Sequence, residues 1–363
     1  MTMESVDHLP LSYKAAVYDK PGDLSIKITE KTMPVPGPGE ALVKLTHSGV
    51  CHSDLSVMKN GWQMPFPVPD TQVGGHEGAG TVAHFGPGAD AYGFKVGDPV
   101  GIKWLRDICG SCVYCLAGED GLCGKQSVSG LFQPGTFQQY VTVPARYLTP
   151  LPAGLDPAMA APMLCAGLTS YGALRKANTK PGNWLVVSGA GGGLGHLVTQ
   201  IASRAFGQRV IGIDQASKES IVKESGAEFF LDVTKAGGDM VAKVMELTGL
   251  GAHTVIVCAA SNAAFGQGLE LLRPGGTLVG VGLPDGDPVP ISTATPGLIV
   301  TRQLKLLGSV LGNRQDAIDV LDLAARGIVT LHYQVRGLGD LQQVFEEMDN
   351  GTIVGRVVLD LDR

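Results

Sequence analysis

Val186-Val-Ser-Gly-Ala-Gly-Gly-Gly-Leu-Gly195 joins an apolar run to a segment with helical periodicity. Small residues in such a turn leave the backbone N–H groups at the helix N-terminus accessible, so that they can hold a pyrophosphate. The strict spacing G-x-G-x-x-G is absent, because Ala190, Gly192 and Gly195 fill its three glycine positions. Methyltransferases and other nucleotide-binding domains use similar turns, so the turn alone indicates only a nucleotide-binding α/β unit.

Asp214 narrows the choice of nucleotide. It follows the next apolar run, 209–213, about 20 residues beyond the turn, where an acidic residue binds a ribose 2′-OH and repels a 2′-phosphate. The alternative is an acid at a strand end that faces only solvent. The spacing favours NAD over NADP.

Strands and helices alternate regularly in the chain after Pro162. The expected strands are 184–188, 209–213, 254–258 and 277–281, and the expected helices are 194–206, 218–225 and 262–271. Alternation at this spacing predicts a parallel, doubly wound sheet, which places the chain in the α/β class.

The chain before Pro150 has a different pattern, with short β-rich runs at 41–46, 80–85 and 138–143 that are broken by Pro and Gly. This pattern predicts a compact β-rich domain. The last segment contains an expected helix at 315–326 and an expected strand at 351–360, and we expect it to return to the first domain. The predicted boundaries are 1–160 for the first part of the β-rich domain, 161–308 for the nucleotide-binding domain and 309–363 for the return segment.

Composition restricts the class of protein. A chain of 363 residues is long enough for two domains, and its 28 Lys+Arg against 34 Asp+Glu include no basic cluster that could neutralise a run of phosphates. Nucleic acid is therefore not an expected partner. No apolar run approaches the ~20 residues of a membrane span, and residues 1–10 carry two acids and no Arg. We expect a soluble, cytoplasmic protein without a targeting segment or a membrane partner.

Four of the seven cysteines are crowded into Cys109-Gly-Ser-Cys112-Val-Tyr-Cys115 and the nearby Cys123. The spacing C-x2-C-x2-C-x7-C suits four thiolates that close a tetrahedron around zinc and leave no position for substrate. An iron–sulfur cluster of the bacterial type has a shorter last gap followed by Pro, whereas Gly124 follows here. The other alternative is four buried cysteines without a ligand. The spacing predicts a structural zinc site.

A second possible metal site is dispersed along the chain. Cys51-His52-Ser53-Asp54, Gly75-His76-Glu77-Gly78 and the distant Cys165 each have an ordinary explanation when taken alone, as a hydrogen-bonded histidine or a small buried thiol. Together they supply two thiolates and an imidazole, the ligand set of a catalytic zinc that keeps one position open.

With these motifs assembled, the chain resembles the medium-chain zinc alcohol dehydrogenases, especially the yeast and fungal tetrameric ethanol-type enzymes, over nearly its whole length. Further similar stretches are Val73–Gly80 (VGGHEGAG), Gly101–Leu105 (GIKWL), Ala161–Gly167 (APMLCAG), Gly312–Arg314 (GNR) and Ile353–Arg356 (IVGR). The resemblance implies a GroES-like catalytic domain built from both chain ends, a Rossmann domain between them and an active-site cleft where they meet. It also implies a homo-oligomer, namely a tetramer.

The resemblance assigns roles residue by residue. It implies that Cys51, His76 and Cys165 hold the catalytic zinc, with Glu77 as an alternate ligand and Asp54 orienting His76. The implied catalytic residues are Ser53, which hydrogen-bonds the substrate oxygen and passes its proton onward, together with His52 and Ser56. The implied NAD contacts are His52, Gly192, Gly193, Leu194, Asp214, Lys218, Gly282 and Arg356, although the loop before Lys218 is one residue shorter than in the yeast pattern.

The implied reaction is reversible hydride transfer between a small primary or secondary alcohol and its aldehyde or ketone, with NAD and two zinc ions per chain, one catalytic and one structural. Two other functions would need only part of this residue set. A zinc-free quinone or enoyl reductase needs none of the cysteine ligands, and a non-catalytic NAD-sensing scaffold needs only the structural zinc. The complete set of Cys51, His76, Cys165 and Ser53 argues against both. Cys258 is left over, and its position in a strand suggests an apolar role.

Two positions depart from the yeast-type pattern. Ser56 stands where a histidine ends the proton relay, and a hydroxyl is a poor base near neutral pH, which predicts a weaker or shifted pH dependence. Met64, by counting back from Gly75, stands where a tryptophan narrows the substrate pocket, while Trp104 matches the second pocket tryptophan. A flexible thioether leaves more room than an indole, which predicts tolerance of larger alcohols. The alternatives are that Met64 packs in the core or that Trp62 supplies the missing ring.

Overall fold

The computed structural model of the protein describes residues 9–66, 68–235 and 239–363, which form two compact units. Unit 1 comprises the described residues up to Cys165 together with Tyr333–Arg363, and unit 2 comprises Ala166–His332. The predicted domain boundaries at 160/161 and 308/309 thus differ from the limits of the compact units. The second limit lies later because helix α10 (Arg314–Ala325) packs on α4 (Leu168–Ala177) within unit 2.

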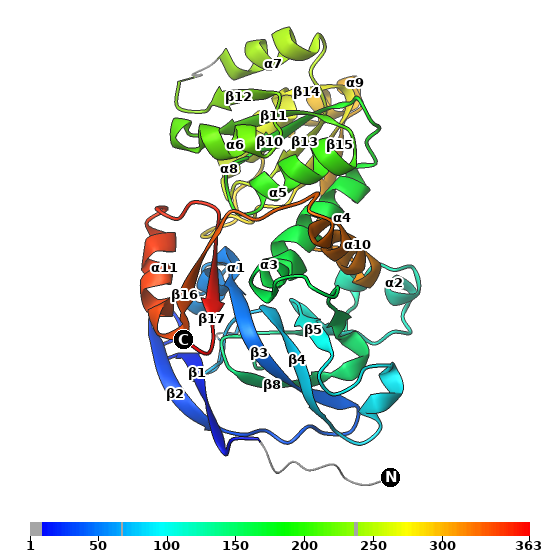
Figure 1. Ribbon diagram of the computed structural model, residues 1–363. Coiled ribbons are helices and arrows are strands. Elements are labelled where there is room, and N and C mark those ends of the chain that lie inside the picture. The colour runs from blue at the N-terminus through cyan, green and yellow to red at the C-terminus, as the bar shows by residue number, and fades with distance from the viewer. Residues whose placement is uncertain (1–8, 67, 236–238) are drawn as a thin grey trace. The chain divides into compact units, whose positions relative to one another are not determined.

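Unit 1 is built on a mixed, mainly antiparallel sheet (Figure 1). Its strand order is β16 (Tyr333–Gly337), β17 (Arg356–Asp360), β3 (Glu40–Val50), β4 (Glu77–Phe85), β5 (Pro99–Ile102) and β9 (Thr149–Pro150), and β8 (Tyr140–Pro144) also pairs with β3. Two small sheets pair β1 (Ser12–Tyr18) with β2 (Ile26–Thr32) and β6 (Leu105–Asp107) with β7 (Ser127–Val128). The last strand, β17, runs antiparallel to β3 and therefore belongs to unit 1.

Short helices fill the connections of unit 1. They are α1 (His52–Lys59), α2 (Val113–Leu116), α3 (Pro157–Pro162) and α11 (Leu341–Asp349). Helix α3 begins where the Asp156 carboxylate accepts a hydrogen bond from the backbone N–H of Ala158, with Pro157 at the first helical position. The C-terminal helix α11 buries Phe345 edge-on against Phe137, at 6.1 Å between ring centroids, in the core of unit 1.

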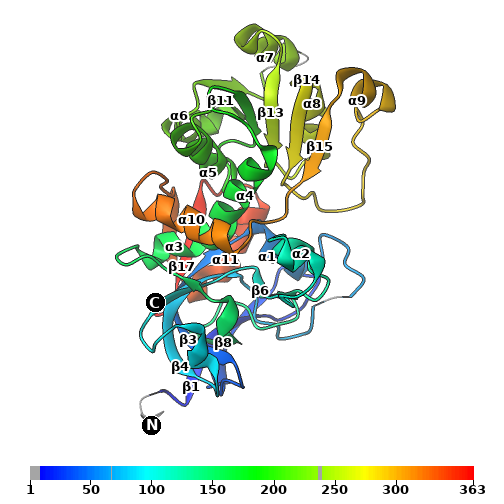
Figure 2. The same cartoon turned by 90° about the vertical axis from the view of Figure 1, so that its right-hand side faces the viewer.

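Unit 2 contains a six-stranded parallel sheet with helices on both faces (Figure 2). The strand order is β12 (Phe229–Asp232), β11 (Arg209–Asp214), β10 (Trp184–Ser188), β13 (Ala252–Val257), β14 (Leu272–Gly280) and β15 (Lys305–Gly308). The covering helices are α5 (Gly195–Gln200), α6 (Glu219–Glu224), α7 (Met240–Thr248), α8 (Asn262–Glu270) and α9 (Pro296–Arg302). The central strands β10 and β13 are mainly apolar and almost wholly buried because both of their faces are covered. The predicted α/β class with a doubly wound sheet and a β-rich domain is confirmed.

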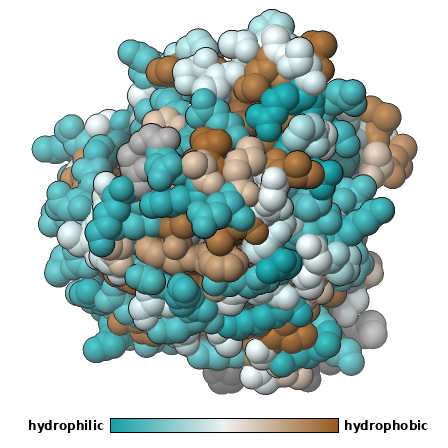
Figure 3. All heavy atoms as spheres, turned by 90° about the horizontal axis from the view of Figure 1, so that it is seen from above, coloured by the Kyte–Doolittle hydropathy of each residue, from teal (hydrophilic) through white to brown (hydrophobic). Residues whose placement is uncertain are grey.

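The surface drawn in Figure 3 is mostly hydrophilic, with small apolar patches between the polar side chains. Within the described ranges, none of the helices combines the length and apolar character that crossing a bilayer requires. Each unit contains a buried apolar core of its own.

Candidate metal centres and cofactor-binding loop

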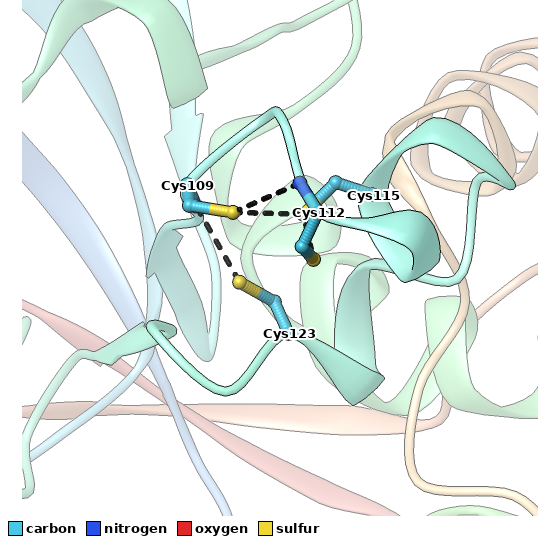
Figure 4. Close-up of side chains that lie close together, drawn as sticks. All are labelled: Cys109, Cys112, Cys115 and Cys123. Atoms are coloured by element: carbon cyan, nitrogen blue, oxygen red, sulfur yellow. Dashed lines mark hydrogen bonds between the residues drawn. The ribbon is translucent and has the colours of Figure 1, made fainter.

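The four crowded cysteines converge in a loop between β6 and β7, which we call the cysteine lobe (residues 109–123; Figure 4). All four are free thiols, and their sulfur atoms lie within 4.8 Å of one another. Cys115 Sγ is 3.8 Å from Cys109 Sγ and 3.5 Å from Cys112 Sγ. Four sulfurs bound tetrahedrally to zinc at about 2.3 Å are roughly 3.8 Å apart, so this arrangement fits a zinc ion.

Backbone N–H groups donate hydrogen bonds to two of the cysteine sulfurs in the lobe. The N–H of Cys112 donates to Cys109 Sγ at 3.3 Å, and the N–H groups of Cys109 and Lys125 both donate to Cys123 Sγ at 3.4 Å. Donation from the Ser111 and Cys112 backbone lowers the pKa of the Cys109 thiol to about 6. The loop therefore favours the thiolate form of Cys109, whereas burial raises the pKa of the Cys115 thiol to about 12.

The second group of possible ligands lies wholly within unit 1. Cys51 precedes α1, His76 comes immediately before β4, Glu77 is the first residue of β4, and Cys165 lies in a π-helical turn, Met163–Gly167. One ligand atom from each of the four lies within 4.8 Å of the others, and His76 Nε2 is 3.1 Å from Cys165 Sγ. Two sulfurs, an imidazole nitrogen and a carboxylate form a donor set that fits zinc.

Asp54 orients this group from the side. The His76 Nδ1–H donates to Asp54 Oδ1 at 2.7 Å, and the other carboxylate oxygen accepts from the Cys51 backbone N–H at 3.0 Å. Burial opposes protonation of the ring, but the adjacent Asp54 carboxylate raises the pKa of His76 well above its usual range. With Nδ1 holding the proton toward Asp54, Nε2 is directed at the two cysteine sulfurs.

Glu77 is held by Arg356, the first residue of β17. The Arg356 Nη2 donates to both carboxylate oxygens of Glu77, at 2.6 Å for Oε2, and both side chains are buried. Burial raises the pKa of Glu77 to about 7 even though the guanidinium beside it lowers that pKa. A Cβ atom at Gly49 would overlap the Glu77 carboxylate, so the pair requires glycine there. Arg356 Nε is buried and lacks a hydrogen-bond partner among the described residues.

Two indole rings pack in series toward His76. The Trp104 ring lies edge-on to the His76 ring at 4.9 Å between centroids, and Trp62 lies edge-on to Trp104 at 6.4 Å. Met64 is partly buried against the core, and its backbone N–H donates to Asn60 Oδ1 at 2.9 Å. The ring beside Trp104 thus comes from Trp62, which is the alternative that sequence analysis left open.

The three residues of the expected proton relay lie in α1 but in different surroundings. Ser53 is half-buried in the first turn, and His52 beside it is exposed. Ser56 is fully buried, and in the described part of the chain its Oγ has no hydrogen-bond partner. The structure brings Ser53 and His52 together at the helix start and leaves Ser56 in the interior.

The glycine-rich turn in unit 2 connects β10 to α5 at the carboxyl edge of the sheet. The Gly191 N–H donates to Asp214 Oδ2 at 2.8 Å, which fixes the acid at the end of β11 beside the turn. A Cβ atom at Gly195 would overlap the Gly189 carbonyl, and a Cβ atom at Gly191 would press on Lys218. Strands β10, β11 and β14 end at this edge, so Gly192, Asp214, Lys218 and Gly282 come from neighbouring segments.

Comparison with known proteins shows to which family the chain belongs. Residues 37–153 match the family model of the alcohol dehydrogenase GroES-like domain, and residues 193–326 match that of the zinc-binding dehydrogenases. The chain is 52% identical over 361 residues to alcohol dehydrogenase 2 of Emericella nidulans, covering 97% of this chain and 98% of the relative. It is 39% identical to an alcohol dehydrogenase of Schizosaccharomyces pombe, with coverage of 98% and 99%.

A solved structure shows a similar fold. Acetophenone reductase from Geotrichum candidum, determined in complex with NAD, is 29% identical with a TM-score of 0.82, and the match covers 97% of this chain and 98% of that chain. The doubly wound nucleotide-binding unit and the two groups of possible metal ligands define a metal-dependent dehydrogenase. The chain belongs to the zinc-type medium-chain alcohol dehydrogenase family. The predicted family and the predicted enzyme class, an alcohol oxidoreductase, are confirmed.

Proposed function

We propose that the protein catalyses reversible hydride transfer between a small primary or secondary alcohol and NAD, at a zinc ion held by Cys51, His76 and Cys165. The observation that carries this proposal is the convergence of these three ligands from distant segments, with Asp54 directing the free nitrogen of His76 toward the sulfurs. Bound zinc supplies a Lewis acid that makes an alcohol hydroxyl acidic near neutral pH. NAD accepts the hydride.

The residues around this centre have separate tasks. Glu77 is close enough to the other three residues to serve as an alternate zinc ligand. The Arg356 guanidinium binds the Glu77 carboxylate and would keep it away from the zinc when substrate takes the fourth coordination position. Ser53 stands two residues after Cys51 and receives the alcohol proton, which the exposed imidazole of His52 passes to solvent. Ser56, with its buried hydroxyl, is left out of this route. Trp62 and Trp104 form the apolar wall that limits the size of the alcohol.

The cofactor is held mainly by unit 2. Gly192, Gly193 and Leu194 supply the phosphate-binding turn, Asp214 and Lys218 bind the adenosine ribose, and Gly282 leaves room for the backbone to approach the cofactor. The role of Asp214 is supported by the Gly191 N–H, which donates to the Asp214 carboxylate and keeps it beside the glycine-rich turn. The resemblance implies that His52 and Arg356 also bind the pyrophosphate, and the Nε of Arg356, which has no partner among the described residues, is a donor suited to a phosphate oxygen.

The cysteine lobe holds a second, structural zinc. Four thiolates fill a tetrahedral shell and leave no position for substrate. The proposed zinc content is therefore two ions per chain.

We retain 1–160, 161–308 and 309–363 as the proposed domain limits. Seven free cysteines fit a reducing compartment such as the cytoplasm, which remains our proposal for its location.

We also propose that the protein forms a homo-oligomer, and the resemblance implies that this oligomer is a tetramer. Strand β15 pairs with β14 on one side, and among the described residues no strand pairs with its other side. Leu306 and Leu307 on this strand are exposed, as is the nearby Val310. An exposed apolar edge strand can pair with its counterpart in a second copy. If so, Leu307→Lys lowers the molar mass measured by light scattering, and an unchanged mass would place the interface elsewhere.

The decisive experiment measures metal content and NADH formation on one purified sample, with alcohols from ethanol to branched secondary and aromatic compounds. We expect two zinc ions per chain and turnover. Cys165→Ser should remove one zinc and the activity, whereas the control Cys258→Ser should keep both. One zinc and no turnover in the wild-type protein would refute the proposal in favour of a non-catalytic scaffold.

A further inference from the structure

A pair of buried opposite charges lies outside the proposed catalytic machinery. Lys103 lies between β5 and β6, and Asp120 is the first residue of a 3-10 helix, Asp120–Leu122, in the cysteine lobe. Their exposed fractions are only 3% and 2%. Burying isolated charges is costly, so the surrounding structure must compensate both.

Tyr147 joins the two charges. The Lys103 ammonium lies 4.1 Å from the centre of the Tyr147 ring and donates to the Tyr147 carbonyl and to Thr149 Oγ1, both at 2.9 Å. The Tyr147 hydroxyl donates to Asp120 Oδ2 at 2.9 Å. The tyrosine thus presents its ring face to the cation and its hydroxyl to the anion, and each of these contacts is strongest when the charge is desolvated.

The network connects two functional parts of unit 1. On the lobe side, the Asp120 carbonyl accepts from the Cys123 N–H at 3.2 Å, so that Asp120 is fixed next to the last cysteine ligand. On the other side, the Lys103 carbonyl accepts from Ser129 Oγ at 3.0 Å, and the Trp104 carbonyl accepts from the Ser129 N–H at 2.9 Å. Ser129 therefore fixes the connection between β5 and β6, in which Lys103 is followed by Trp104, the ring that packs against His76.

We propose that Tyr147, with Lys103 and Asp120, is a positioning network that fixes the Cys123 end of the cysteine lobe and thereby slows the loss of the metal bound there. The proposal rests on the structural zinc site proposed above. None of the three side chains is a metal ligand. They act through Cys123, whose sulfur must stay in register with Cys109, Cys112 and Cys115 for the tetrahedron to close.

Tyr147→Phe tests the network with the smallest change, since it keeps the ring over Lys103 and removes only the hydroxyl. The matched control is Tyr13→Phe, which removes a hydrogen bond of the same length, 2.9 Å to Gln138 Oε1, from another buried tyrosine of unit 1. The measurement is the rate of zinc release from the full-length protein into an excess of a chromophoric chelator. A Cys165→Ser sample, which lacks the catalytic ligand set, identifies the phase that belongs to the lobe.

We expect Tyr147→Phe to release the lobe metal about tenfold faster or more, as the loss of a hydrogen bond to a buried charge implies. The release from the catalytic group and the rates of Tyr13→Phe should stay within about twofold of wild type. In cadmium-loaded protein, the thiolate-to-metal absorption should decay with the same accelerated phase. Asp120→Asn, which keeps a hydrogen-bond acceptor but removes the charge, should also accelerate release of the lobe metal. This variant replaces Tyr147→Phe in the test if Tyr147→Phe does not fold.

Lobe release at the wild-type rate in both variants would overturn the network while leaving the structural zinc site in place. An equal acceleration of both phases, or of Tyr13→Phe, would also overturn it, because general loosening of unit 1 would then explain the result. A wild-type protein without a lobe phase would refute the structural zinc site and the network together.

Discussion

Asp54 accepts the Nδ1 proton of His76 at 2.7 Å, and both side chains are almost completely buried. The same carboxylate also accepts the N–H of Cys51, so that one acid fixes two of the proposed zinc ligands. A carboxylate in this position sets the histidine tautomer and increases the basicity of the nitrogen that binds metal.

Asp54→Asn should therefore weaken zinc binding at the catalytic group. Because asparagine retains an oxygen that can cap α1 but loses the charge, we expect affinity to fall about 10- to 100-fold with little loss of fold. Competition against a calibrated chelator measures this zinc affinity. Asp340→Asn is the control, since Asp340 accepts the Gly337 N–H at 2.9 Å in a comparable helix start of the same unit. Equal affinities in the two variants would contradict the role of Asp54.

Asp214→Ser should change the choice of cofactor. Removal of the carboxylate eliminates the hydrogen bonds to the ribose and the repulsion of a 2′-phosphate, so KM for NAD should rise about tenfold while NADP becomes usable. Steady-state kinetics with both cofactors measure the ratio. Asp232→Ser is a matched control, because Asp232 ends the adjacent strand in register with Asp214. A preference that stays unchanged in Asp214→Ser would show that another residue selects NAD.

Trp62→Ala should enlarge the accepted alcohol. The Trp62 ring packs on Trp104, which packs on His76, so its removal opens space on the side of the proposed zinc. One added methylene in an apolar pocket changes kcat/KM by about tenfold or more, and the ratio of longer to shorter alcohols should rise accordingly. Met64→Ala and Met64→Trp are the comparison. If Met64→Trp shortens the preferred chain and Trp62→Ala has no effect, the pocket is limited by Met64 as the sequence count suggested.

Ser53→Ala and Ser56→Ala should separate the two serines of α1. Loss of a proton acceptor at the substrate lowers kcat about 100-fold, which we expect for Ser53→Ala. The buried Ser56 hydroxyl has no partner among the described residues, so Ser56→Ala should leave kcat within about twofold and the pH–rate profile unchanged. A shifted pH profile in Ser56→Ala would restore Ser56 to the proton relay.

Cys258 should stay unreactive in the folded protein. It is half-buried, and the burial of its thiol raises the pKa to about 12 from an ordinary 9.0. The raised folded pKa means that this contribution to stability is complete below pH 9 and is lost as pH rises toward 12. Alkylation followed by mass spectrometry should find Cys258 unmodified at pH 8 in native protein and modified in denaturant. Rapid native labelling would show that the thiol is accessible.

The sequence predicted the sheet of unit 2 and the cysteine lobe because their signals are local. Strand β10 coincides with the apolar run 184–188, and four cysteines within one loop leave few arrangements other than a metal site. The grouping of Cys51 and His76 with Cys165 rested on their ligand chemistry and on the resemblance, since nothing in the spacing places Cys165 beside them. The structure adds the distances that make the group a plausible ligand set.

Three features depend on contacts that no local pattern reveals. Trp62 packs on Trp104 in the loop that follows α1, where Asn60 adopts a left-handed conformation at the end of the helix. The Glu77–Arg356 pair joins residues from opposite ends of the chain. Lys103 lies in the stretch Gly101–Leu105, which resembles the family, but its partners Tyr147 and Asp120 carry no sequence signal of their own.

The two proposed zinc sites draw their ligands from the chain in different ways, and this sets the order in which they can assemble during synthesis. All four sulfurs of the cysteine lobe are present once Cys123 has emerged from the ribosome, whereas the catalytic group remains incomplete until Cys165 follows. Domains fold in the direction of synthesis, and metal binding contributes directly to folding. The lobe can thus capture its ion on a nascent chain while the catalytic centre is still missing a thiolate.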